Sequence, residues 1–154
     1  MLLDETDLKI LKILQADARV SNQDLAEQVG ISASPCLRRV RKLEQDGVIE
    51  RYVTLVNPKA VGRGQQAFIE VRLEHQNRVL TERFEAEVQK FPEVLECYLV
   101  AGEWDYVLRV AVPDLEELRN FHMNKLGKVP GISNVKSNIC MKQAKFSTEL
   151  PLEL

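Results

Sequence analysis

The order of strand-like and helix-like patterns between residues 66 and 141 constrains the fold most strongly. In AFIEVRLE (67–74), apolar and polar residues alternate, as they do in a half-buried strand. Two later segments repeat apolar residues at helical spacing, and three more are rich in strand-forming residues. The predicted elements are strand 67–74, helix 80–91, strands 94–100 and 105–112, helix 114–126 and strand 135–141. This β-α-β-β-α-β order predicts a ferredoxin-like sandwich, and hence an α+β protein.

In such a sandwich, two helices cover one face of the sheet and leave the other open. The residues expected on the open face are Phe68, Tyr98 or its neighbours, and Ile139 or Cys140, depending on the strand register. A single sheet with an open apolar face is suited to pairing with a second copy. We therefore expect a homodimer built through this domain. On the covered side, the second helix is predicted to turn four residues inward: Leu115, Leu118, His122 and Leu126.

Three short helices precede this domain, and a very tight turn joins the last two. The second helix opens at Ser21, and Gly30 offers the left-handed residue that ends it. Only Ile31 separates Gly30 from Ser32, the expected N-cap of the third helix. The small side chain of Ala26 lets the two helices approach closely at the turn. These features predict a helix-turn-helix unit.

The third helix gathers positive charge. In SASPCLRRVRKLEQDG (32–47), four cations fall within five positions, and no acidic residue occurs between Glu27 and Glu44. The whole chain has a net charge of -2, so this charge is a local feature. Polar side chains of this helix recur at intervals of four, three and four residues and so form one outward stripe: Ser34, Arg38, Arg41 and Gln45. Arg39 and Lys42 flank this stripe. Arginine side chains suit guanine edges and phosphates in the major groove, whereas the plainer interpretation is a solvated surface.

The segment VIERYVTLVNPKAVG (48–62) has the composition of two short strands, with a break near Asn57-Pro58. It predicts a wing that completes a winged helix-turn-helix domain. The glycines of GRGQQ, which follows, predict a flexible join. The expected domains are a DNA-binding domain at 1–61, with wing and linker at 48–65, and a ferredoxin-like ligand-binding and oligomerisation domain at 66–154.

Composition narrows the remaining classes. The chain is 45% hydrophobic and 29% charged, which is typical of a folded domain rather than a disordered one. It has no apolar run that could span a bilayer, and its start, MLLDETDLK, does not resemble a secretory signal. Cys36, Cys97 and Cys140 are odd in number and far apart, which fits a reducing compartment. We therefore expect a cytoplasmic protein without metal, cofactor or membrane association.

A hairpin at AGEWDY (101–106) combines groups that suit a small zwitterion. Gly102 permits a close backbone approach or a positive φ, and Asp105 either bonds local amides or holds an ammonium group. Trp104 either packs against a dimer partner or forms an apolar wall. Backbone amides, one carboxylate and a wall together predict a site for a free amino acid.

Taken together, these parts resemble the Lrp/AsnC (feast/famine) family of bacterial and archaeal regulators over nearly the whole chain. The most specific pieces are ISASPCLRRVRKLEQDGVI (31–49), which is closer to the leucine-responsive branch, and ECYLVAGEWDYVLRVAVPD (96–114), which contains the family's Gly-x-x-Asp hairpin. The resemblance implies a sequence-specific DNA-binding transcriptional regulator. Its dimers would assemble into tetramers of dimers and bind an amino acid between dimers, with leucine and methionine as the first effectors to consider.

The expected site residues follow from the stripe, the hairpin and this resemblance. Those expected to contact double-stranded DNA are Asn22, Ser32, Ser34, Pro35, Arg38, Arg39, Arg41, Lys42, Gln45 and Arg51. Those expected to contact the effector are Leu99, Val100, Ala101, Gly102, Glu103, Trp104, Asp105, Asn138, Ile139 and Cys140.

Two other functions compete with this prediction. One is an amino-acid-sensing oligomeric module without specific DNA binding, against which the cationic stripe argues. The other is an enzyme similar to the sirohaem decarboxylases, which use histidines in the second domain. Only His75 and His122 are present here, and no Ser-His-Asp, Cys-His or metal-type spacing accompanies them. We therefore do not expect catalysis.

Overall fold

The structure, a computed structural model, describes residues 2–153. The chain divides into two compact units: one runs to Thr54 and takes in the tail from Ala144, and the other is Leu55–Gln143. The tail, which the sequence predicts in the second domain, is bound to the first unit by Gln15. The Gln15 amide donates to the Leu150 carbonyl at 3.1 Å and accepts from the Leu150 N–H at 2.7 Å. Leu152 then packs against the core of the helices.

The first unit contains α1 (Glu5–Ala16), α2 (Asn22–Val29) and α3 (Ala33–Gln45). Asp4 caps α1, because its carboxylate accepts the Asp7 N–H at 2.8 Å. Ser21 caps α2 by accepting the Asp24 N–H at 3.1 Å. Gly30 ends α2 in the left-handed region, with φ 81°. The predicted helix-turn-helix is confirmed.

The predicted wing strands do not form within this chain. Residues 51–57 contain no strand, and Val53, Leu55 and Val56 are exposed. The Tyr52 hydroxyl ties this segment to α3 by donating to the Glu44 carboxylate at 2.9 Å. Its residues favour strands, but a strand needs a hydrogen-bonding partner, and an isolated hairpin is marginal in water. The sequence pattern therefore indicated correctly that these residues favour strands, but it did not show that they lack a strand to pair with.

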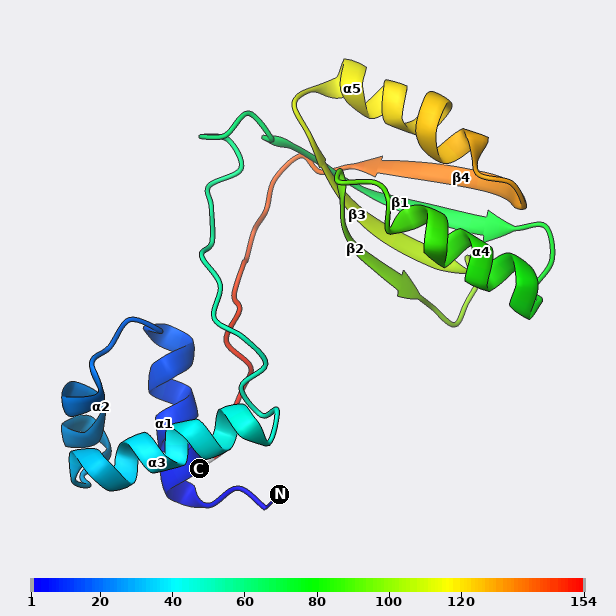
Figure 1. Ribbon diagram of the computed structural model, residues 1–154. Coiled ribbons are helices and arrows are strands. Elements are labelled where there is room, and N and C mark those ends of the chain that lie inside the picture. The colour runs from blue at the N-terminus through cyan, green and yellow to red at the C-terminus, as the bar shows by residue number, and fades with distance from the viewer. Residues whose placement is uncertain (1, 154) are drawn as a thin grey trace. The chain divides into compact units, whose positions relative to one another are not determined.

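The second unit has the predicted order of elements. They are β1 (Gln65–Leu73), α4 (Arg78–Val88), β2 (Val94–Leu99), β3 (Tyr106–Val112), α5 (Leu115–Asn120), the π-helical turn η1 (Phe121–Lys125), the 3-10 turn η2 (Leu126–Lys128) and β4 (Ile132–Ile139). The strands lie in the order β2-β3-β1-β4, and all neighbours are antiparallel. Figure 1 shows α4 and α5 on the same side of this sheet.

The core lies between the helices and the covered face of the sheet. Ile69 and Val71 of β1 are fully buried there with Phe84 of α4 and Phe121 from the turn after α5. One prediction for this side was wrong: Leu115 is 54% exposed. The turn η1 is π-helical and therefore wider than an α-helical turn, so the α-helical spacing that placed Leu115 inward does not hold through this segment.

The open face carries two exposed aromatic side chains among charged pairs. Phe68 is 43% and Tyr98 57% exposed, as the sequence predicts for this face. Asn138 pairs with Phe68 in the register, so Ile139, the next residue, lies on the covered side of β4. The alternative of an open-face Ile139 is therefore wrong. The open face is more polar than expected, because its arginines and lysine pair with glutamates.

Candidate DNA-binding surface and effector pocket

The position of α3 is fixed by its contact with α2. Ala26 of α2 is buried at the turn, and the Asn22 side-chain amide donates to the Ala33 carbonyl at the start of α3, at 2.8 Å. Cys36 and Leu43 turn into the core and are fully buried. These contacts hold one face of α3 and leave the opposite face to solvent.

That outer face carries the predicted stripe. Ser34, Arg38, Arg41 and Gln45 are all exposed. Among the described residues, the side chains of Arg38 and Arg41 make no hydrogen bond and no ion pair. Lys42 is exposed as well and lies 3.1 Å from Asp46, one turn further along α3. Two guanidinium groups are thus free to meet an external anion.

Arg39, by contrast, faces away from the stripe. Its Nη1 lies 2.7 Å from an oxygen of Asp4 and 2.8 Å from one of Asp7, which is only 4% exposed. The Asp7 backbone N–H and the Arg39 guanidinium lower the pKa of Asp4. A buried carboxylate such as Asp7 needs a nearby cation, and Arg39 supplies it. We therefore correct the prediction that Arg39 contacts DNA: it ties α3 to the start of α1.

The other residues predicted to contact DNA differ in their exposure to solvent. Asn22 is half-buried and occupied by its bond to Ala33, so its role is to join the two helices. Pro35 is half-buried in the first turn of α3. Ser32 is exposed at the N-cap of α3 and makes no capping bond with its side chain. Arg51 is exposed beyond α3.

The hairpin of the second unit lies between β2 and β3 and is joined to β1. The Val100 N–H donates to the Asp105 carbonyl at 2.9 Å, and the Asp105 N–H donates to the Val71 carbonyl at 3.0 Å. Gly102 has φ 153°, a conformation that side chains disfavour, so the predicted positive φ is present.

Arg72 of β1 holds the tip of this hairpin, which the sequence did not predict. Its guanidinium donates to the Glu103 carbonyl at 3.1 and 2.7 Å, and to the Glu103 carboxylate at 3.2 Å. The same group lies 5.0 Å from the ring centroid of Trp104, a cation–π distance. Glu103 and Trp104 are thus organised by Arg72, 31 residues away from Glu103.

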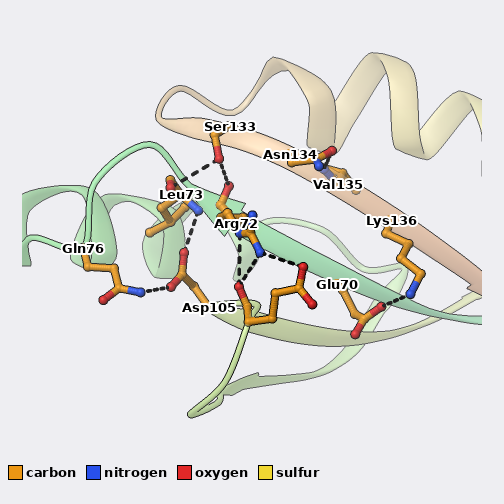
Figure 2. Close-up of polar contacts among 10 residues, drawn as sticks. Glu70, Arg72, Leu73, Gln76, Asp105, Ser133, Asn134, Val135 and Lys136 are labelled. Carbon is orange, nitrogen blue, oxygen red and sulfur yellow. Dashed lines mark hydrogen bonds and ion pairs between the residues drawn. The ribbon is translucent and has the colours of Figure 1, made fainter.

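The Asp105 carboxylate accepts hydrogen bonds from two donors that lie 32 and 29 residues away in the sequence, rather than from the local amides that the sequence allowed. It is 6% exposed, and one carboxylate oxygen accepts the Leu73 N–H at 2.7 Å. The other accepts the Gln76 side-chain amide at 2.6 Å. Figure 2 shows both donors reaching Asp105 from β1 and the connection that follows it. The carboxylate therefore braces the hairpin against the end of β1.

A cavity of about 450 Å³ opens beside this brace. Of the residues predicted for the effector, Leu99, Val100, Ala101 and Asp105 line it. The sequence missed the other lining residues, which are Leu73, Gln76, Asn77, Arg78, Thr81 and Tyr106. They come from strand ends, from the connection between β1 and α4, and from α4 itself, and only the folding of the sheet brings them to the hairpin. Burial and the Glu85 carboxylate raise the pKa of Tyr106, whose hydroxyl donates to Glu85 at 2.6 Å.

The last-strand residues predicted for the effector do not line this cavity. Asn138 donates to the Glu70 carboxylate at 2.9 Å on the open face, where Asn138 and Lys136 lower the pKa of Glu70. Ile139 lies on the opposite face of β4, and the Cys140 N–H donates to the Gln66 carbonyl at 2.9 Å. Gly102, Glu103 and Trp104 also lie outside the cavity lining. The chain thus brings four of the ten residues predicted for the effector to this cavity.

The two histidines are far from forming a metal centre. His122 is half-buried, with Nδ1 2.9 Å from the Ser137 hydroxyl oxygen, and His75 is exposed. Residues 2–153 contain no group of three His, Cys, Asp or Glu side chains that would hold a metal ion. Over the same residues, no helix combines the length and apolar character needed to cross a membrane.

Comparisons with known proteins agree with this architecture. The family described as "Lrp/AsnC ligand binding domain" matches residues 66–150, and "Winged helix-turn-helix DNA-binding" matches residues 3–50. The chain is 39% identical over 152 residues to the DNA-binding transcriptional activator DecR of Escherichia coli, covering 99% of this chain and 100% of DecR. It is 38% identical over 151 residues to the leucine-responsive regulatory protein of Salmonella typhimurium, covering 98% and 92%.

A solved structure is equally similar. The crystal structure of a transcriptional regulator of Neisseria meningitidis in complex with L-Met has a TM-score of 0.93 and 39% sequence identity, and the match covers 97% of each chain. The names of DecR and of the Neisseria protein describe transcriptional regulators, and that of the Salmonella relative describes a regulatory protein.

Proposed function

Because the chain belongs to the Lrp/AsnC family of DNA-binding transcriptional regulators, we propose that it reads DNA with the outer face of α3 and responds to a free amino acid held beside the Gly102–Asp105 hairpin. The observation that supports DNA reading is that the guanidinium groups of Arg38 and Arg41 have no partner within residues 2–153. Ser34, Lys42 and Gln45 are exposed on the same helix. A regulator of this kind acts on the chromosome, which in a bacterium or archaeon lies in the cytoplasm.

The mechanism follows from how α3 is presented. A helix held by its neighbour along one side can lie in the major groove with the other side against the base edges. Arg38 and Arg41 would bond guanine edges or phosphates, while Ser34 and Gln45 add shorter-range contacts. Arg51 and Ser32 would contact the flanking backbone. In a dimer, two such helices meet successive half-sites about 10 bp apart.

The direct test is DNA binding after selection of preferred sequences from genomic fragments. Arg38→Ala should weaken specific binding by about 1–3 kcal/mol and relax sequence preference. Arg19→Ala is the matched control, because Arg19 is also exposed but lies outside α3. Fluorescence anisotropy on a selected fragment measures both. Unchanged specific affinity for Arg38→Ala would refute the role of Arg38, and a wild type without any sequence preference would favour the sensing module instead.

For the effector we propose L-leucine or L-methionine. The support is the 450 Å³ cavity, which is lined by the Asp105 carboxylate and by apolar residues such as Leu73 and Leu99, together with the L-Met complex of the similar Neisseria protein. The remaining predicted contacts, including Trp104 and Asn138, would be supplied when a second dimer closes the pocket. Bound effector would then change how dimers pack, and so the spacing or bending of bound DNA. Calorimetry with wild type and Asp105→Ala tests the pocket: unchanged binding in the variant would move the site elsewhere.

We also propose that the open face of the sheet pairs two copies, which would assemble further into a tetramer of dimers. Phe68 and Tyr98 supply exposed aromatic area for such an interface. Sedimentation velocity should show Phe68→Glu dissociating the assembly. Met123→Glu, at a similarly exposed residue of η1, should leave it intact. A wild type that sediments as a monomer at micromolar concentration would contradict this proposal.

A further inference from the structure

The two donors that hold the Asp105 carboxylate differ in how easily they can be replaced. One oxygen accepts the backbone N–H of Leu73, the last residue of β1, at 2.7 Å. The other accepts the side-chain amide of Gln76 at 2.6 Å. A backbone donor at a strand end is fixed, whereas a glutamine side chain can change rotamer. Only the Gln76 bond can therefore open without disturbing the sheet.

Gln76 is placed where such a movement is unhindered. It is exposed, lies in the connection between β1 and α4, and lines the same cavity as Asp105. Asp105 itself is 6% exposed and needs a donor on each oxygen, because an unpaired buried carboxylate is costly. Figure 2 shows Gln76 extending from the connection to the outer oxygen of Asp105. Together with the Leu73 N–H, this amide gives each oxygen of the carboxylate a donor.

An amino acid entering the pocket would offer a better donor at that point. The Gln76 amide is neutral, whereas an α-ammonium is charged, and charged donors make stronger hydrogen bonds to carboxylates. We infer that Gln76 occupies the ammonium position of the effector pocket and is displaced when an amino acid binds, an inference that rests on the proposed function above. Gln76 then sets both affinity and selectivity. A ligand without an α-ammonium group gains nothing by displacing it.

The expected change in effector affinity follows from the fraction of molecules in which Gln76 is bonded to Asp105. Where only a fraction of molecules is open for binding, the apparent Kd is raised by the inverse of that fraction. A hydrogen bond of ordinary net strength corresponds to a factor of about three to ten. Gln76→Ala should therefore tighten binding of L-methionine or L-leucine by about three- to tenfold. Gln76→Lys, which tethers an ammonium group next to Asp105, should weaken it by about tenfold or more.

The experiment is isothermal titration calorimetry on the full-length chain with L-methionine and L-leucine. Gln89→Ala is the control, since Gln89 is exposed in the same unit and does not line the cavity. Thermal melts verify that each variant folds. Gln76→Asn, whose side-chain amide is shorter by one methylene, is a second variant that is expected to tighten binding. Asp105→Asn in the wild-type and Gln76→Ala backgrounds completes a double-mutant cycle, in which the effect of Gln76→Ala should vanish. The deaminated analogue 4-methylpentanoate should not bind more tightly to Gln76→Ala.

Equal binding of L-methionine and L-leucine by wild type and Gln76→Ala would overturn the inference and leave the proposed pocket in place. An effect of Gln76→Ala that persists with Asp105→Asn, or that appears equally with 4-methylpentanoate, would also overturn it. If neither L-methionine nor L-leucine binds to wild type or to Gln76→Ala, both the inference and the proposed effector function fail.

Discussion

On the open face of the sheet, Arg109 lies 2.7 Å from Glu96 and Lys136 lies 3.2 Å from Glu70, whereas on α3 the guanidinium groups of Arg38 and Arg41 have no partner among the described residues. Both surfaces are rich in cations, so charge content alone does not distinguish them. They differ in whether each cation forms an ion pair with a neighbouring carboxylate. A cation that is already bonded to a neighbouring carboxylate supports the fold, and one without a partner is available to an external anion.

The same contrast occurs within α3, between adjacent residues. Arg39 is held by Asp4 and Asp7, while Arg38 points to solvent. The sequence shows five positions with four cations and gives no sign that one of them is internal. The acids that hold Arg39 are about 35 residues away in the chain, and only the packing of α1 against α3 brings them together.

The largest expected effect comes from pairing the free cations artificially. Ser34→Glu places a carboxylate four residues before Arg38, and Gln45→Glu places one four residues after Arg41, both at helical ion-pair spacing. The double variant should bind its selected DNA fragment about 100-fold or more weakly, because it pairs both arginines and adds charge that repels phosphates. Fluorescence anisotropy measures the loss. The control is Gln89→Glu with Gln143→Glu, which adds the same charge elsewhere; equal losses in the two proteins would remove the distinction between the surfaces.

Removing the paired arginine of α3 should affect stability instead. Arg39→Ala leaves the buried Asp7 without its cation and should lower the free energy of unfolding by about 1–3 kcal/mol, a range reduced because Arg39 is itself partly exposed. Urea unfolding followed by circular dichroism measures the change. The adjacent Arg38→Ala should alter stability by less than about 0.5 kcal/mol. Comparable destabilisation by both variants would show that Arg38 also has an internal partner.

A smaller effect is expected from the pH dependence of the sheet unit. The Arg109 hydrogen bond lowers the pKa of Glu96 below its ordinary 4.5. A carboxylate with a lowered folded-state pKa adds stability above that ordinary value, and this contribution is lost as the pH falls through the folded-state pKa. The urea midpoint, followed by the fluorescence of Trp104, the only tryptophan, should therefore fall below pH 4.5. In Arg109→Met the urea midpoint should decrease less steeply with falling pH than in wild type, and in Arg38→Met it should decrease as in wild type.

Local patterns predicted most of the fold. The alternation in β1, the cap at Ser21, the left-handed Gly30 and the order of all six elements of the sandwich were readable because each depends on residues close in sequence. The exposure of Leu115 follows from the local π-helical turn η1, and the other failures involve long-range partners. Residues 51–57 find no strand to pair with, and the register of β4 against β1 decides which side Ile139 takes.

The candidate sites divide in the same way. The stripe of α3 follows from helical spacing alone, so its exposed members were predicted correctly as a set. The cavity is lined by the hairpin, strand ends, the β1–α4 connection and the start of α4, so the sequence predicted the hairpin members of the lining but not Gln76. It also missed Arg72, which holds the hairpin from outside the cavity lining. Both missed residues act through hydrogen bonds that span about 30 residues.

The salt dependence of DNA binding tests the central claim most directly. Each phosphate contact releases counterions, so the slope of log K against log salt counts those contacts. If the free cations of α3 meet the DNA, Arg41→Ala should reduce the slope by about 1 relative to wild type, and Arg109→Ala, which removes a paired cation, should leave it unchanged. Equal slopes for wild type, Arg38→Ala and Arg41→Ala, or a reduced slope for Arg109→Ala, would contradict the assignment of DNA binding to the outer face of α3.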